Sequence, residues 1–283
     1  MMAYRSLILA IAVIAGACPV DSSATASSTI IGGDTSAPNA FPATGMLVVG
    51  AHLACTATLV APDVALTAAH CLTPPTFGDF GFTLDTDTSD GTDNIIPVRT
   101  THQHPDFDDR VDEFLGLAVR NDIGVIILER PILDVPPAQI DTPMFDTPLD
   151  TGNQLAMCGY GRVSWYGSAY PLKRDALVVV DKAQDHEFST APVDPQPCIG
   201  DSGAPLFLDS PEGPRIVGVV SRAVGSSNMC DTGAIITRVG PYAPWIAEAS
   251  QDRDSGCNAG GGGTALPLGA ALATLARRRR TPR

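Results

Sequence analysis

The chain has 283 residues, of which 44% are hydrophobic and 17% are charged, so it can bury a sizeable core in one large or two moderate domains. The formal net charge is -13, and between Ile30 and Gly256 there are 30 acidic and 12 basic residues, a balance of -18. Such a surface repels nucleic acid and anionic lipid, which argues against both as partners of the folded part.

Short β-branched runs indicate strands. Residues 178–180 are three valines, and residues 216–220 read IVGVV. With 24 prolines and 27 glycines in the chain, these runs predict an all-β protein with many turns.

The N-terminal segment is typical of a secretory signal peptide over residues 1–17. Arg5 supplies a positive charge, residues 7–14 are apolar, and small residues form a cleavage site at residues 15–17. Residues 18–29 are small and polar, which suits a short propeptide or linker. Cys18 directly follows the cleavage site, and whether it is lipidated stays open.

Four short segments carry the residues of a nucleophilic site. In chain order they are residues 30–33 (IIGG), 66–71 (LTAAHC), 121–128 (NDIGVIIL) and 198–205 (CIGDSGAP). A serine hydroxyl needs an adjacent base, and an imidazole exchanges protons near neutral pH. A carboxylate just before an apolar strand is a costly placement unless it has a partner. In this order the segments resemble those of the trypsin/chymotrypsin-like serine proteases, the peptidase S1 family.

The resemblance implies a role for each of these residues. Ser202 would be the nucleophile, His70 the general base, and Asp122 the acceptor that orients His70. The backbone N–H groups of Gly200 and Ser202 would hold the oxyanion. The match departs from the usual pattern at Ala204, where glycine is common, and at Tyr160 and Arg222, where tryptophan is common.

The resemblance also implies a fold: two six-stranded antiparallel Greek-key β-barrels with the site between them, and a short C-terminal helix starting in residues 241–246. The peptidase domain is expected at residues 30–249. The N-terminal barrel would cover about 30–135 and the C-terminal barrel about 150–249.

Activation in this family follows cleavage before the first isoleucine, here Ile30. The new α-amine would pair with Asp201 and order the oxyanion loop. Thr29 precedes the cut and is neither lysine nor arginine, so the activating protease is unknown.

The cysteines fit a secreted protein. The resemblance implies two disulfides, Cys55–Cys71 and Cys198–Cys230. Cys158 has no obvious partner, and a buried free thiol is favoured over a bond to Cys18 or Cys257.

The resemblance places a substrate pocket at Gln196, Ser221, Arg222, Ala223 and Gly233. Gln196 is neutral, which disfavours cleavage after lysine or arginine. Ser221 would hydrogen-bond Asp122, and residues 221–223 would pair with the substrate backbone. For Arg222 two interpretations stay open: it favours acidic groups upstream of the cut, or it points to solvent.

An acidic loop contains Asp85, Asp87, Asp90 and Asp93, and closely spaced carboxylates suit calcium. A solvated acidic loop is the favoured interpretation, and no other metal or cofactor is expected.

The C-terminal segment, residues 250–283, is expected to be a linker and a sorting tail. A 20-residue uncharged span from Cys257 to Ala276 could cross a bilayer, and four arginines follow at residues 277–280. This pattern resembles the tripartite sorting tails of myxobacterial surface proteins, which implies bacterial surface display or release. Membrane contact would occur only through this tail.

The function expected is therefore a secreted or surface-displayed serine endopeptidase acting on proteins or peptides. The alternatives are a catalytically silent homologue that serves as a surface binding module, and a serine esterase on the same site.

Overall fold

A computed structural model describes residues 30–37, 39–50, 52–73, 79–89, 94–110, 116–144, 148–162, 172–225 and 230–252. The expected signal peptide, the linker and nearly all of the C-terminal tail therefore lie outside the described residues. Among the helices that are described, none is long and apolar enough to span a membrane.

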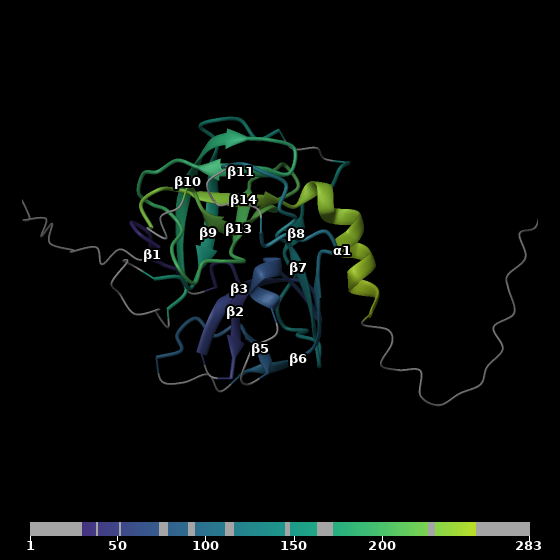
Figure 1. Cartoon of the computed structure of the whole chain (residues 1–283). Helices are drawn as coiled ribbons and strands as arrows, with labels where there is room; N and C mark the ends of the chain where they lie inside the picture. The colour runs from purple at the N-terminus through teal and green to yellow at the C-terminus, as the bar shows by residue number, and fades with distance from the viewer. Residues whose placement is uncertain are drawn as a thin grey trace, which may run out of the picture.

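The first barrel is built from six strands and closes on itself (Figure 1). The strands are β2 (Thr44–Val49), β3 (His52–Ala61), β4 (Val64–Thr67), β5 (Phe80–Thr83), β6 (Ile96–Gln103) and β7 (Gly124–Leu128). Their order around the barrel is β2-β3-β4-β7-β6-β5, and β5 pairs antiparallel with β2 to close it.

The second barrel also has six strands in its ring. They are β9 (Gln154–Gly159), β10 (Arg174–Ala183), β11 (Glu187–Thr190), β12 (Pro205–Leu208), β13 (Arg215–Ala223) and β14 (Ala234–Arg238). Their order is β9-β10-β11-β14-β13-β12, closed by the pairing of β12 with β9. Two short strands add to it: β1 (Asp34–Thr35) beside β10, and β8 (Gln139–Ile140) parallel to β13.

Three short helical segments are named in the described residues, and a 3-10 turn at residues 250–252 follows the last of them. They are the 3-10 helices η1 (Ala69–Leu72) and η3 (Gly240–Tyr242) and the α-helix α1 (Ala243–Ala249). The prediction of two six-stranded antiparallel barrels with a short C-terminal helix is confirmed.

The two barrels share one connection scheme. In each, three successive strands are neighbours, and the ring then continues with the sixth, fifth and fourth strand. The sequence shows no strong internal repeat, so the duplication is one of topology.

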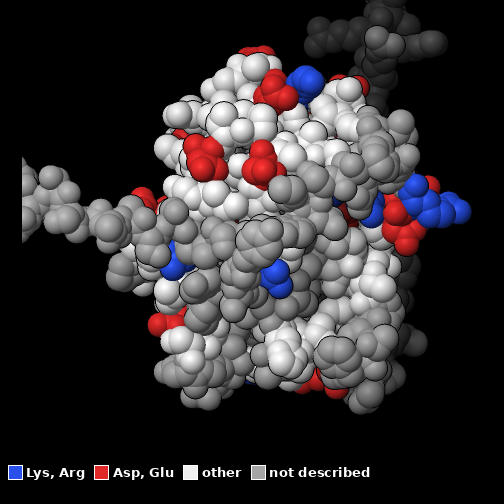
Figure 2. All heavy atoms as spheres, turned by 60° about the vertical axis from the view of Figure 1, so that its left-hand side comes forward, with Lys and Arg blue, Asp and Glu red and all other residues white. Residues whose placement is uncertain are grey.

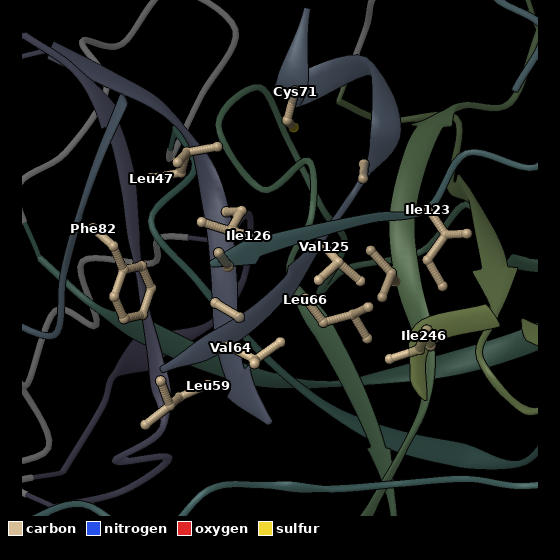
Figure 3. Close-up of a cluster of buried hydrophobic side chains, with 14 of the residues drawn as sticks. Leu47, Leu59, Val64, Leu66, Cys71, Phe82, Ile123, Val125, Ile126 and Ile246 are labelled. Atoms are coloured by element: carbon tan, nitrogen blue, oxygen red, sulfur yellow. The ribbon is translucent and has the colours of Figure 1, made fainter. Parts of the chain in front are cut away.

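The core of the first barrel is made of aliphatic side chains and Phe82 (Figure 3). Leu47, Leu59 and Phe82 are fully buried, and each such side chain contributes about 1.5–3 kcal/mol. Ile246 of α1 also belongs to this cluster. The C-terminal helix therefore packs on the first barrel although the second barrel precedes it in sequence.

The first described residues, in contrast, pack on the second barrel although the first barrel follows them in sequence. Ile30 is fully buried in the core cluster of the second barrel, together with Ala204. Ile31 pairs with Gln196, and β1 pairs with β10. Each barrel therefore contacts a segment that belongs, in sequence, beside the other barrel: α1 packs on the first barrel, and Ile30 and β1 pack on the second.

Charge on the surface is mostly negative, as the composition predicts. On the face that Figure 2 shows, acidic side chains lie at several separate places, with a few basic ones among them.

Candidate active site

His70 lies in η1, directly after strand β4. Cys71 forms a disulfide with Cys55 of β3, with Cα atoms 6.2 Å apart, which ties this short helix to the barrel. The His70 side chain is 30% exposed, and its Nδ1 lies 2.8 Å from Asp122 Oδ2. The other ring nitrogen, Nε2, lies 3.7 Å from Cys71 Sγ and is the one that can accept a proton from a nucleophile.

Asp122 precedes β7 and is fully buried. Its Oδ1 accepts the His70 backbone N–H at 2.9 Å, and Oδ2 also accepts the Ser221 hydroxyl at 2.6 Å. Burial alone raises the pKa of Asp122, whereas the His70 charge and the hydrogen bonds from His70 and Ser221 lower it. The net result is a pKa below the usual value, so this carboxylate stays ionised.

The backbone before Asp122 is unusual. Asn121 has φ +55°, in the left-handed region that asparagine tolerates better than most residues. Its side chain is held at both ends: Nδ2 donates to Asp106 O at 2.8 Å, and Oδ1 accepts the Tyr242 hydroxyl at 2.8 Å. These contacts aim Asp122 toward His70.

Ser202 lies in the loop between β11 and β12, and this loop contacts strand β3 of the first barrel. The Ser202 carbonyl accepts the Thr56 N–H at 2.8 Å. Gly203 has φ +83°, and a Cβ there would collide with Thr56 O and Thr67 Oγ1. Only glycine at this position lets the serine loop approach the segment that leads into His70.

Within the described residues, no hydrogen bond joins the Ser202 hydroxyl to His70. In sites without substrate this contact is commonly long and tightens when substrate binds.

The loop before Ser202 presents two free amide donors. Ile199 O accepts the Arg162 N–H at 2.7 Å, and because a trans peptide points its C=O and N–H in opposite directions, the Gly200 N–H faces away from Arg162. Thr56 Oγ1 donates to Gly200 O at 3.1 Å and fixes the next peptide. In the described part of the chain, neither Gly200 N–H nor Ser202 N–H has an acceptor, as expected for an oxyanion hole.

Comparison with known proteins decides the family. A family model described as trypsin matches residues 30–246. The chain belongs to the trypsin family.

Three proteases from different organisms are similar to this chain over most of its length. The chain is 27% identical to mouse cathepsin G over 231 residues, which cover 77% of this chain and 84% of that protein. It is 26% identical to brachyurin of Leptuca pugilator (77% and 96% covered) and 28% identical to a trypsin-like protease of Streptomyces glaucescens (84% and 88% covered). Membership of this family makes the protein a serine endopeptidase, a hydrolase.

A solved structure of neuropsin, a serine protease expressed in the limbic system of mouse brain, has the same fold. It superposes with a TM-score of 0.61 at 21% identity and covers 77% of this chain and 98% of that chain.

Asp201, which trypsin-family activation would use, is completely buried. Its carboxylate accepts two backbone N–H groups, from Gly161 at 2.8 Å and from Cys198 at 3.0 Å. Burial raises its pKa to about 7, although these hydrogen bonds lower it. Among the described residues no cation contacts this carboxylate. Ile30 is buried in the cluster that contains Ala204, three residues after Asp201.

Both expected disulfides form: besides Cys55–Cys71, Cys198 is bonded to Cys230 with Cα atoms 4.8 Å apart. Cys158 is a buried free thiol, as favoured from the sequence. Burial raises the pKa of this thiol to about 12, so it stays protonated and unreactive.

Two of the departures from the family pattern, Ala204 and Tyr160, are accommodated in the protein interior. Ala204 is fully buried in the second core. Tyr160 is also fully buried, and its hydroxyl donates to Asp85 O at 2.8 Å.

Gln196 and Gly233, two of the predicted pocket residues, are hydrogen-bonded to each other. Gln196 Oε1 accepts the Gly233 N–H at 2.8 Å, and Nε2 donates to Asp194 Oδ1 at 3.2 Å. Gln196 is 3% exposed, so this end of the pocket is a neutral amide already engaged on both sides. Ser221 and Ala223 lie at the end of β13, on the strand that leads from the triad hydrogen bond.

The interpretation in which Arg222 points to solvent is wrong, whereas a preference for acidic groups upstream of the cut is a property of substrate cleavage that the contacts of Arg222 do not test. Its side chain is 5% exposed and forms a two-pronged ion pair with Glu187, with both N–O distances at 2.9 Å. The guanidinium therefore does not project into solvent. Glu187 lies 35 residues earlier in a run with no motif, so no sequence signal identified it.

The acidic loop is described only in part. Asp85 accepts a hydrogen bond from Asn94, and Asp87 accepts one from the Ser89 N–H; Asp90 and Asp93 lie outside the described residues. The calcium hypothesis therefore stays a prediction. The one described cluster with metal-ligand spacing is Cys55, His70 and Cys71, whose sulfurs are joined in the disulfide.

Two functional residues were missed from the sequence. Thr56 fixes Gly200 and Ser202, and Thr237 donates its hydroxyl to Asp122 O at 3.0 Å. The position of Thr56 beside Cys55, whose partner adjoins His70, was the available signal for the first. Thr237 lies in a segment, residues 237–239, that also resembles the family, but the resemblance gave it no role.

Proposed function

We propose that this protein is a secreted or surface-displayed serine endopeptidase that hydrolyses peptide bonds through an acyl-enzyme on Ser202. The observation that carries the proposal is the chain of hydrogen bonds from Ser221 to Asp122 to His70 beside a serine loop with two free amide donors.

In the first half of the reaction, Ser202 Oγ attacks the peptide carbonyl carbon and its proton passes to His70 Nε2. Asp122, already ionised and bonded to His70 Nδ1, stabilises the imidazolium. His70 then gives the proton to the leaving amine, and water releases the acyl group by the same route in reverse.

Charge that develops on the carbonyl oxygen is met by the N–H groups of Gly200 and Ser202. Loss of one such donor costs about 100- to 1,000-fold in kcat, so the orientation of the Gly200 peptide is a large part of the rate. Thr56 and the Arg162 N–H hold that orientation.

Activation by cleavage before Ile30 would supply the cation that Asp201 lacks among the described residues. A buried carboxylate without a counter-charge is costly, and the raised pKa of Asp201 reflects that cost. Ile30 is buried in the core cluster that contains Ala204. Its new α-amine would pair with Asp201 and order the loop at residues 198–203.

The pocket supports cleavage after neutral residues in proteins or peptides. The amide of Gln196 is occupied by Gly233 and Asp194 and carries no charge to attract lysine or arginine. Secretion and display rest on residues 1–17 and on the tail, which are sequence-based proposals.

The test is active-site labelling. The full chain, cut before Ile30 to expose the authentic amine, is treated with a fluorophosphonate probe; Ser202→Ala and the uncut chain are the controls. We expect label only on the cut wild-type chain, and cleavage of peptides as well as esters. A folded, cut chain that takes no label would show a silent homologue, and cleavage of esters alone would show an esterase.

A further inference from the structure

The ion pair between Glu187 and Arg222 is placed deep in the second barrel. Glu187 begins β11 and Arg222 lies near the end of β13, with β14 between them (Figure 1). The two side chains are 2% and 5% exposed. Arg222 Nη1 donates to Glu187 Oε1 and Nη2 donates to Oε2. This bidentate arrangement is the one in which a guanidinium and a carboxylate match best.

Both partners also hold the segment that leads to the catalytic aspartate. Glu187 Oε2 accepts the Ala118 N–H at 2.8 Å, and Arg222 Nη2 donates to Gly116 O at 3.1 Å. This segment ends a few residues before Asp122. The pair therefore anchors a loop of the first barrel to the sheet of the second.

The pair is also bonded to the triad. Arg222 Nη1 donates to Ser221 Oγ at 3.3 Å, and Ser221 donates to Asp122. A donor chain of this kind polarises each bond in it. A charge change at Arg222 would thus be felt at the active site.

A pocket of about 320 Å³ adjoins the pair, lined by Ala118, Val119 and residues 184–187. Val119 is 54% exposed, and Asp185 is exposed as well. Glu187 cancels the charge of Arg222, so the pocket offers the apolar surface of Ala118 and Val119 and the negative charge of Asp185. Arg238 also lies beside it, because its Nη1 donates to Gln184 O at 3.2 Å.

Stability alone does not explain the pair. Well-packed apolar residues usually stabilise a buried position as well as an ion pair does, because two charges must be taken out of water. The contacts with Gly116, Ala118 and Ser221 instead connect the pair to the segment before Asp122 and to the triad.

We propose that Glu187 and Arg222 are a positioning and specificity-determining pair for substrate residues upstream of the cut. The pair fixes residues 116–119 as a wall of the pocket, and Glu187 cancels the charge of Arg222. The pocket accordingly admits neutral or basic side chains and discriminates against acidic ones. This inference rests on the proposed endopeptidase function.

The experiment compares two peptides that differ only in glutamate or glutamine at the positions two to four residues upstream of the cut. With the cut full chain we expect wild type to prefer the glutamine peptide. Glu187→Gln frees the charge of Arg222 and should raise the glutamate-to-glutamine ratio of kcat/KM about tenfold, mainly through KM.

Two further variants distinguish the effect of the Glu187–Arg222 pair from the effect of removing any carboxylate near the pocket. Asp185→Asn removes one carboxylate from the same pocket without touching Arg222, and should shift the ratio several times less than Glu187→Gln. In the double variant Glu187→Gln with Arg222→Gln, the ratio should return to within about twofold of wild type, while KM for both long peptides stays raised because the anchor of residues 116–118 is weakened.

The same ratio is measured as peptide affinity in a Ser202→Ala background, which needs no turnover. An unchanged ratio in Glu187→Gln, or equal shifts in Glu187→Gln and Asp185→Asn, would overturn the inference, as would failure of Ser202→Ala to bind either peptide. Fluorophosphonate labelling of Ser202 tests the proposed function separately, so the two failures are distinguishable.

Discussion

At the scale of single residues, the site depends on a few side chains that hold backbone in place. Asp201 and Thr56 touch no substrate in the proposed mechanism, yet each fixes a peptide of the oxyanion loop. Gly203 has the same role through the absence of a side chain.

Asp201→Asn is expected to give a folded protein that behaves like the uncut chain. An amide cannot hold an ion pair with the Ile30 amine, so kcat/KM of the cut chain should fall at least about a hundredfold. Circular dichroism and peptide kinetics measure the two properties. Asp209→Asn, at an exposed position, is the matched control. Full activity in Asp201→Asn would contradict the activation proposal.

Thr56→Val removes the hydroxyl that bonds Gly200 O at 3.1 Å. We expect kcat to fall about tenfold with KM little changed, because the bond supports the oxyanion loop and not ground-state binding. Thr58→Val is a control from the same strand, since in the described structure its buried hydroxyl has no partner. Equal effects of the two substitutions would show that the hydroxyl of Thr56 has no special role.

At the scale of elements, short segments position the site: η1 carries His70, and α1 and β1 link each barrel to the other. The 3-10 helix η1 has four residues and depends on the Cys55–Cys71 disulfide for its attachment to β3. The short helix α1 and the short strand β1 each bind the barrel that is distant in sequence.

Replacing both Cys55 and Cys71 by serine should destabilise the protein by about 3 kcal/mol, since the closed loop spans 16 residues. Activity should fall as well, because η1 carries His70. Guanidinium unfolding and kcat of the same sample give both values. Cys158→Ala, which removes a buried thiol but no disulfide, should cost less. A double-serine variant as stable and active as wild type would show that the disulfide is not needed to hold η1 in place.

At the scale of the whole molecule, burial of one carboxylate couples folding to pH. In the uncut chain the pKa of Asp201 is about 7, above the 3.8 of an ordinary aspartate, so the folded state binds this proton more tightly than the unfolded state. The resulting stabilisation is complete below about pH 4 and is lost as the pH rises toward 7.

Between pH 4 and 7 the uncut chain should therefore lose up to about 4 kcal/mol of unfolding free energy relative to Asp201→Asn. Denaturant unfolding of the two proteins across this range measures the difference, in which the other titrating groups cancel. Cutting before Ile30 should reduce the loss, because the amine then pairs with the carboxylate. Parallel stability curves for the two uncut proteins would contradict the burial of an unpaired Asp201.

The fold was largely predictable from the sequence. Strand content follows from β-branched runs and abundant turn residues, which act locally, and the barrel architecture followed from the resemblance carried by four short motifs. The identities of His70, Asp122 and Ser202 were predictable for the same reason: each lies in a motif whose neighbours are close in sequence.

Contacts between distant segments were decided only by the tertiary structure. The pairing of Arg222 with Glu187, the support of Gly200 by Thr56 and the contact of Thr237 with Asp122 join residues 35, 144 and 115 positions apart. A side chain's partner depends on how strands stack and which face each presents, and a local pattern does not encode that. The sequence by itself thus determined the candidate triad and the class of chemistry. The packing of the two barrels decided which residues support that triad, which charges are buried or paired, and which backbone donors stay free.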